Sequence, residues 1–193
     1  MKYNPVIHHR RSIRLKGYDY SKEGMYFITI CCHQRKNWFG KIENEIMVLN
    51  EYGKIARHEW DDLPTRFSNI ELGEFVIMPN HMHGIIMINS PGPGPSADKG
   101  SGASPDPTTT TTTTMTTMTT ATKTVGDMVG AYKSLVAVKS LNIFKLENND
   151  RLMGKLWQRN YYEHIIRDEQ SFNRISDYIK NNPENWQHDK FKN

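Results

Sequence analysis

The sequence contains little cysteine, and its two cysteines, Cys31 and Cys32, are adjacent. Neighbouring residues of a strand point to opposite faces, so these thiols are not expected to bond to each other. The lack of spaced cysteines excludes a disulfide framework and favours a reducing compartment. The sequence also lacks an apolar run near the roughly 18 residues of a membrane span, and residues 1–12 lack the apolar region of a secretory signal. We therefore expect a cytoplasmic protein.

The charge is weakly basic, with 25 Lys and Arg against 21 Asp and Glu, a net charge of +4 over 193 residues. This balance permits a polyanionic partner without demanding one. The cations concentrate near the N-terminus, where Arg10, Arg11, Arg14 and Lys16 precede Tyr18. Such an arm can neutralise phosphates or enter a groove of DNA, although a solvated basic tail is the common alternative.

Residues 90–124 differ from the rest in composition. They are rich in Pro, Gly, Ser and then Thr, with seven threonines unbroken from 108 to 114. A segment with so little apolar surface cannot offset its ordering entropy, so we expect a disordered insertion. Neither flank looks self-sufficient. Residues 1–89, with the basic arm, and residues 125–193 are therefore predicted to form two parts of one domain.

The hydrophobic pattern predicts strands at 25–33, 46–50, 70–78, 81–88 and 161–167, and helices at 51–63, 125–144 and 169–181. Asn50 is the expected N-cap of the first helix, Pro64 its end, and "NNP" the end of the last. This order predicts an α+β fold, an antiparallel-rich sheet with helices packed on it. The strand at 81–88 is apolar on both faces past Gly84, so it should be central in the sheet.

His81 and His83 stand one residue apart in this strand, in "MPNHMHGIIMI". Side chains alternate along a strand, so both imidazoles should emerge on one face. Two close imidazoles suit one shared divalent cation. The alternative is a pair of hydrogen-bonded core histidines.

The last predicted helix offers a third ligand. Tyr178 and Asn182 are four residues apart, beside an apolar stripe of Phe172, Ile175 and Ile179. The phenol and the amide oxygen can therefore face one groove. The alternative is that Tyr178 packs at the border of the core and Asn182 is a helix C-cap.

The segments "MPNHMHGIIMI", "KLWQRNYYEHIIRDE" and "ISDYIKNNPENW" resemble the signatures of REP-associated tyrosine transposases, a branch of the single-tyrosine HUH transposases. The resemblance covers nearly all of the chain except the Thr-rich insertion, which departs from the compact family pattern. It implies a ferredoxin-like HUH nuclease fold and metal-dependent nicking and rejoining of single-stranded DNA at hairpin-forming repeats, through a 5′-phosphotyrosine. It also implies that His81, His83 and Asn182 bind Mg²⁺ or Mn²⁺ and that Tyr178 is the nucleophile.

Further residues are candidates for the site or for DNA contact. Tyr161 and Tyr162 compete with Tyr178 as nucleophile, but Tyr178 has a partner at helical spacing and matches the family position. We expect support for the site from Glu163, His164 and Arg167, where His164 either positions the tyrosine or phosphate or is structural. Candidate DNA contacts beyond the arm are Lys133, Ser134, Trp157 and Arg159, and Trp157 either stacks on DNA or lies in the core.

Two other functions compete with the transposase. One is an inactive DNA-binding protein that recognises repeat hairpins. The other is a different H-x-H metalloenzyme, but the predicted helices argue against an all-β cupin, and 193 residues are few for a (β/α)₈ barrel. The sequence leaves the oligomeric state open between a monomer and a dimer that exchanges the tyrosine helix.

Overall fold

A computed structural model describes residues 14–15, 17–89, 123–148 and 154–192. Within these residues an antiparallel sheet has the strand order β4-β5-β1-β6. Its strands are β1 (Gly24–Cys31), β4 (Ile70–Ile77), β5 (His81–Ile88) and β6 (Tyr162–Ile166). A separate hairpin pairs β2 (Gly40–Glu43) with β3 (Ile46–Leu49). The strand order and the helices between the strands give the β-α-β-β-α-β topology of a ferredoxin-like fold, as the sequence resemblance implies.

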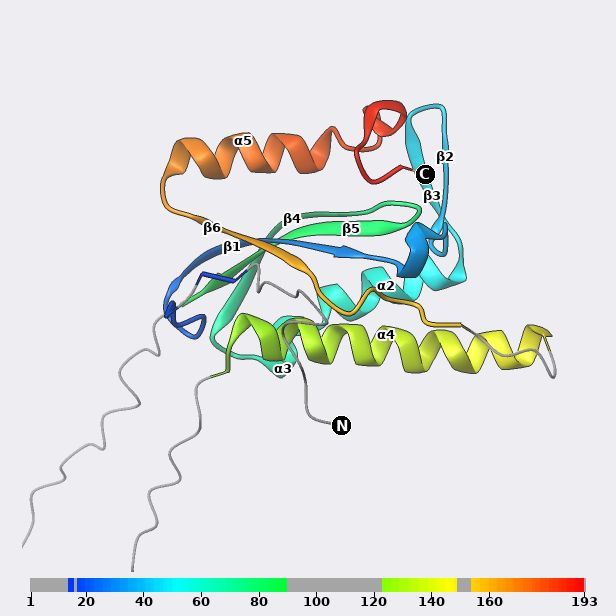
Figure 1. Ribbon diagram of the computed structural model, residues 1–193, viewed down its shortest axis with the longest axis horizontal. Helices are drawn as coiled ribbons and strands as arrows, with labels where there is room; N and C mark the ends of the chain where they lie inside the picture. Colours follow the sequence, from blue (N-terminus) through cyan, green and yellow to red (C-terminus); the bar gives the residue numbers. More distant parts are fainter. Residues whose placement is uncertain (1–13, 16, 90–122, 149–153, 193) are drawn as a thin grey trace, which may run out of the picture.

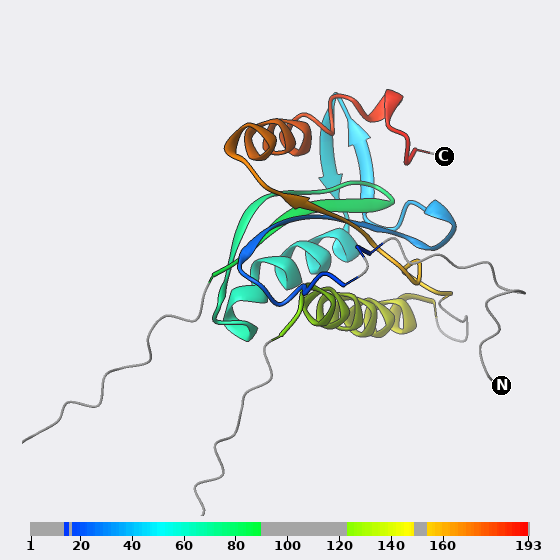
Figure 2. The ribbon, with the colours of Figure 1, turned by 60° about the vertical axis from the view of Figure 1, so that its left-hand side comes forward.

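Helices cover both faces of the sheet (Figure 1). On one face lie α2 (Glu51–Asp61), the short α3 (Leu63–Arg66) and α4 (Val125–Asn148). On the other face lies α5 (Glu169–Lys180), which packs over β4. Figure 2 shows the same layers from the side, with the β2–β3 hairpin rising past the sheet toward the C-terminal segment. The predicted antiparallel sheet with packed helices is thus confirmed.

The two faces of β5 build two different apolar layers. Met82, Ile86 and Ile88 point toward α2 and α4 and join the large core around Trp60. Ile85 points the other way and packs with Ile175 of α5 in a smaller cluster. Since both faces are covered, the strand is apolar throughout. β5 lies between β4 and β1, which confirms its predicted central position.

Most element boundaries follow the predictions, with local exceptions. Asn50 caps α2 as expected, because its side-chain oxygen accepts a hydrogen bond from Gly53 N at 3.0 Å. The first helix was predicted to run to residue 63 and to be ended by Pro64, but α2 ends at Asp61 and Pro64 lies in the first turn of α3, where its missing N–H is not needed. Strand β2 was not predicted. It is short, and its chain reverses at Asn44 and Glu45, which both have positive φ angles.

The chain segments on either side of residues 90–122 share one sheet. β6, from the later segment, pairs antiparallel with β1, from the earlier one. The expected disordered insertion lies outside the described residues except for Lys123 and Thr124. The chain leaves the sheet after Asn89 and returns to the domain at the start of α4. There Val125 N donates to Tyr20 O at 3.0 Å.

Candidate active site

β5 places the histidine pair against α5. His81 and His83 face the same side of the sheet as Ile85, while Met82 between them enters the large core. Both imidazoles are buried, and their Nε2 atoms lie 3.1 Å apart. Two ring nitrogens at this separation can both bind one ion that lies between them.

Asn80 fixes the tautomer of His81. The Asn80 Nδ2 group donates to the carbonyl oxygens of Arg35 at 3.2 Å and Phe191 at 2.8 Å. Its Oδ1 atom is therefore the acceptor that faces His81 Nδ1 at 2.8 Å. His81 Nδ1 must carry the proton, and Nε2 keeps a free lone pair.

His83 has an analogous support in Thr29, whose hydroxyl oxygen lies 2.7 Å from His83 Nδ1. With Nδ1–H donating to that hydroxyl, the Nε2 lone pair faces His81, which is the tautomer that metal binding requires. Burial lowers the pKa of His81 to about 3 and the pKa of His83 well below its ordinary value. Both rings are therefore neutral near pH 7 and available as ligands.

Helix α5 brings Tyr178 to the histidines. Asp168 caps the helix by accepting from Ser171 N at 2.7 Å, and Ile175 and Ile179 bury its apolar side against the sheet. The Tyr178 hydroxyl then lies 3.2 Å from His83 Nε2 of the same chain. Burial raises the pKa of this phenol, while a hydrogen bond from the Asn182 side chain opposes the shift.

Asn182 lies just beyond α5, in a turn where its N–H donates to Ile179 O at 3.3 Å. The helix C-cap is Asn181, so the alternative reading of Asn182 as the cap is wrong. Asn182 is buried, and its Oδ1 atom has no hydrogen-bond partner among the described residues. A buried oxygen without a donor is suited to a ligand that the chain itself does not supply.

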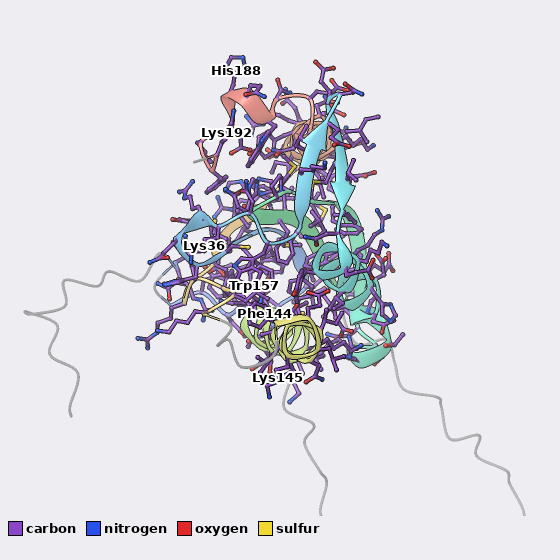
Figure 3. The ribbon with its side chains drawn as sticks, turned by 90° about the vertical axis from the view of Figure 1, so that its right-hand side faces the viewer. Lys36, Phe144, Lys145, Trp157, His188 and Lys192 are labelled. Carbon is purple, nitrogen blue, oxygen red and sulfur yellow. The ribbon has the colours of Figure 1, made fainter. Side chains whose placement is uncertain are left out.

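The C-terminal segment, residues 186–192, closes the site from the other side. The Phe191 ring centroid lies 4.8 Å from that of His81 and 5.6 Å from that of His83. Asp189 Oδ2 lies 3.7 Å from His81 Nε2, and the three ligand atoms of His81, His83 and Asp189 lie within 4.8 Å of one another. Figure 3 shows His188 and Lys192 of this segment beside the upper end of the hairpin.

Asp189 is the site residue that sequence reasoning missed, because it follows the last predicted element. A signal was nevertheless present. Trp186 and Phe191 are aromatic residues in a segment without helical or strand periodicity. Such residues indicate that the chain folds back onto the domain, and Asp189 lies between them.

A cavity of about 380 Å³ lies next to the histidines. Its wall includes the cationic side chains of Arg35 and Lys190, together with residues His164 and Glu163 of β6. Thr29 and Phe191, which contact the two histidines, also line it. The cavity therefore adjoins the histidine pair through Thr29 and Phe191, and Arg35 and Lys190 bring positive charge to its wall.

The predicted supporting residues divide between the two faces of β6. His164 lies opposite Phe27, on the α5 face and at the cavity. Glu163 points away, with its side chain 2% exposed and its Oε1 atom 3.8 Å from Arg14 Nε. Arg167 lines a second cavity, of about 320 Å³, near Arg14. The structure thus brings His164 to the site and leaves the Glu163 carboxylate on the far side.

The competing tyrosines are placed differently from Tyr178. Tyr161 is buried in the large core and accepts a hydrogen bond from Arg14 Nη2 at 2.7 Å. Tyr162 is exposed on the α5 face and lines the larger cavity, with its ring centroid 6.1 Å from that of Phe191. Of these three tyrosines, Tyr178 has its hydroxyl within hydrogen-bond distance of His83 Nε2.

The candidate DNA contacts have mixed settings. Arg10, Arg11 and Lys16 lie outside the described residues. Lys133 donates to the carbonyl oxygens of Gln158 and Arg159, at 2.7 and 3.0 Å. Ser134 and Arg159 are both exposed. Trp157 is a core residue rather than a stacking surface, because its ring is buried near Phe39 and Tyr132 on the α4 side of the sheet (Figure 3).

None of the described helices is long and apolar enough to cross a membrane. No family model matches the chain. The chain is 43% identical over 191 residues to an uncharacterised protein of Haemophilus influenzae. This alignment covers 97% of this chain and 96% of that protein.

Among solved structures, a REP-associated tyrosine transposase bound to a REP hairpin has a TM-score of 0.55 and 16% identity, covering 92% of this chain and 76% of the other. A protein of Deinococcus radiodurans R1 aligns at a TM-score of 0.43 and 18% identity, over 87% of this chain and 95% of the other. The chain therefore belongs to the same family as the Haemophilus influenzae protein, and its fold is that of the REP-associated tyrosine transposase.

Proposed function

We propose that the protein is a metal-dependent DNA strand-transferase that nicks and rejoins single-stranded DNA at hairpin-forming repeats. The observation that carries the proposal is the 3.2 Å separation of the Tyr178 hydroxyl from His83 Nε2. These atoms come from α5 and β5, 95 residues apart in the sequence. A nucleophile and a pair of neutral imidazoles thus meet beside a cationic cavity.

The residues present fit a divalent cation. His81 and His83 offer two Nε2 lone pairs, and the Asn182 Oδ1 atom is buried without a partner among the described residues. These three residues would hold Mg²⁺ or Mn²⁺. Such an ion, when bound, polarises the scissile phosphate and stabilises charge on the leaving oxygen.

Tyr178 performs the covalent step. Its hydroxyl oxygen attacks phosphorus as its proton leaves, the bond from phosphorus to the 3′-oxygen breaks, and a 5′-phosphotyrosine and a 3′-hydroxyl result. Attack by a 3′-hydroxyl reverses the step and releases Tyr178, so no ATP is needed. Burial raises the pKa of the phenol, so the resting nucleophile is protonated and must lose its proton as it attacks.

The DNA would approach over the cationic cavity. Arg35 and Lys190 offer charges for phosphate oxygens, and His164 and Tyr162 offer ring faces or hydrogen bonds to the strand beside the site. We also propose DNA contacts for the basic arm with Arg10, Arg11, Arg14 and Lys16 and for Lys133, Ser134 and Arg159. The structurally similar transposase is bound to a REP hairpin, which supports hairpin DNA as the partner. A protein that acts on DNA and has two free thiols also fits the cytoplasm.

The test is a covalent adduct assay. The full chain is incubated with a labelled hairpin oligonucleotide from repeats flanking its own gene and with Mg²⁺ or Mn²⁺. We expect a denaturation-resistant adduct that Tyr178→Phe abolishes and that Tyr52→Phe, the same change on α2 at the other face of the sheet (Figure 1), leaves. Hairpin binding without an adduct under either metal would favour the alternative function, an inactive protein that recognises repeat hairpins.

A further inference from the structure

The C-terminal segment carries a carboxylate to the histidine pair. Asp189 is the acidic residue of the three-residue cluster with His81 and His83, and its side chain is only 3% exposed. Its Oδ2 atom lies 3.7 Å from His81 Nε2. The carboxylate is therefore buried within reach of the Nε2 atom of His81.

The geometry around one point between these atoms suits a metal ion. The two Nε2 atoms are 3.1 Å apart, and the Asp189 oxygen is 3.7 Å from the nearer one. With bonds of roughly 2.1 Å, such separations subtend angles of roughly 95° and 125° at one ion. Both angles lie in the range of ordinary coordination, so the donor atoms need little rearrangement.

The carboxylate is held in this orientation by its own segment. Asp189 Oδ1 accepts a hydrogen bond from Phe191 N, which turns Oδ2 toward His81. The segment is itself tied to the domain, because Arg35 donates to Lys190 O at 2.7 Å and Asn80 donates to Phe191 O at 2.8 Å. Asn80 also orients His81, so one amide side chain fixes both ligand-bearing segments.

The chemistry of the proposed ion points the same way. Two imidazoles and an amide are all neutral ligands, whereas Mg²⁺ and Mn²⁺ prefer oxygen ligands and gain most from a charged one. The Asp189 carboxylate supplies both an oxygen ligand and a negative charge. Among the described residues, it is the carboxylate that clusters with this histidine pair.

We infer that Asp189 is a direct ligand of the divalent ion at His81 and His83, so that the C-terminal segment completes the metal site. The inference rests on the proposed function for the presence of an ion, and it adds the charged ligand. It predicts that metal affinity depends on a residue beyond the tyrosine helix. The ion, in turn, should stabilise the closed position of residues 186–192.

Mn²⁺ binding to the full chain without DNA, followed by electron paramagnetic resonance and calorimetry, tests the inference. Asp189→Asn keeps an acceptor for Phe191 N but removes the charge, and we expect at least tenfold weaker binding. Glu184→Gln, the same change at an exposed residue, should bind within twofold of the natural protein. A hydrogen-exchange measurement should also show that saturating Mn²⁺ protects the amides of 186–192 in the natural protein and not in Asp189→Asn.

The outcomes separate this inference from the transposase proposal. Natural affinity in a folded Asp189→Asn protein, or no Mn²⁺ binding by the natural protein at millimolar concentrations, would overturn the ligand role. An Asp189-dependent Mn²⁺ site without any DNA adduct would support it while contradicting the strand-transferase function. If Asp189→Asn unfolds, Asp189→Glu keeps the charge and must retain binding within tenfold, or the inference fails.

Discussion

Gly84 lies directly under the indole of Trp60. A Cβ atom built on Gly84 would come within 2.3 Å of Trp60 Cζ2, which is closer than any van der Waals contact. Trp60 is fully buried at the end of α2, so its ring has little room to move away. The close approach of helix and strand therefore needs glycine at the position that follows His83.

Gly84→Ala should destabilise the fold and disturb the site. We expect a loss of roughly 1–3 kcal/mol in the free energy of unfolding, the usual cost of overpacking a core. Urea denaturation measures it. The matched control is Gly130→Ala, on the exposed side of α4 with nothing within 4 Å of the new Cβ. This change should stabilise the helix by roughly 0.5–1 kcal/mol. Equal effects at the two glycines would contradict the packing argument.

Thr29→Val should weaken metal binding without unfolding the protein. The substitution keeps the shape of the buried side chain but removes the hydroxyl 2.7 Å from His83 Nδ1. The imidazole then loses the partner that fixes its tautomer, and loss of such partners typically costs 10- to 100-fold in metal affinity. Calorimetric titration with Mn²⁺ measures the change. Thr29→Ser keeps the hydroxyl and should bind as the natural protein does, and identical affinities for valine and serine would refute the support role.

Acid should destabilise the protein through its buried histidines. The folded-state pKa of His81 is about 3, below the unfolded value near 6.5. Between these values the unfolded chain binds more protons than the folded one, so stability falls as pH decreases from 6.5 toward 3. For His81 the decrease is at most about 1.4 kcal/mol per pH unit.

Denaturation curves between pH 7 and pH 4 measure this slope. His81→Gln should make the slope shallower, because the substituted residue does not titrate. His188→Gln is the control, since His188 is exposed at the surface (Figure 3) and should leave the slope unchanged. A slope insensitive to His81→Gln would mean that other groups control acid unfolding.

Arg14 and Glu163 should be energetically coupled on the face away from the histidines. Glu163 has a buried carboxylate without a hydrogen-bond partner among the described residues, and the Arg14 guanidinium lies 3.8 Å from it. Arg14→Met removes that charge and should cost roughly 1–3 kcal/mol of folding free energy. Adding Glu163→Gln should recover part of the loss.

A double-mutant cycle in urea measures this coupling. The exposed pair Lys41 and Glu43 provides the comparison, and Lys41→Met there should cost less than roughly 1 kcal/mol. Additive effects of Arg14→Met and Glu163→Gln would show that the two charges do not interact.

The sequence predicts most of the fold because its periodicity is strong. The pattern of β5 indicates a strand covered on both faces, and Phe172, Ile175 and Ile179 mark the buried side of α5, where the structure places them. Strand β2 has only four residues, with weak alternation, so its pattern was too short to read. Pro64 is compatible with both the end of one helix and the start of another, and only the fold decides between them.

The site was predictable where spacing along one element defines it. His81 and His83 share a face because strands alternate, and that inference needs no tertiary information. Asp189 and Thr29 reach the same histidines from a terminal segment and a neighbouring strand. Their positions depend on sheet register and on the return of the C-terminal segment to the histidines, which local patterns do not encode. Alternation separates Tyr162 and Glu163 to opposite faces, but only the pairing of β6 with β1 shows which of the two faces α5.

The first residues of β5 are fixed by pairing on both sides, whereas the connection that follows its last residues can vary in length. His81 and His83 lie at its beginning, whereas the chain leaves it after Asn89, roughly 24 Å away at the usual rise of an extended strand. Pairing with β1 and β4 holds the histidines in register regardless of how many residues connect Asn89 to Thr124. Closing a longer connection costs only about 0.6 kcal/mol per doubling of its length. The connection between Asn89 and Thr124 can therefore be lengthened, by evolution or by insertion of an epitope or a reporter. The histidines at the opposite end of β5 keep their positions.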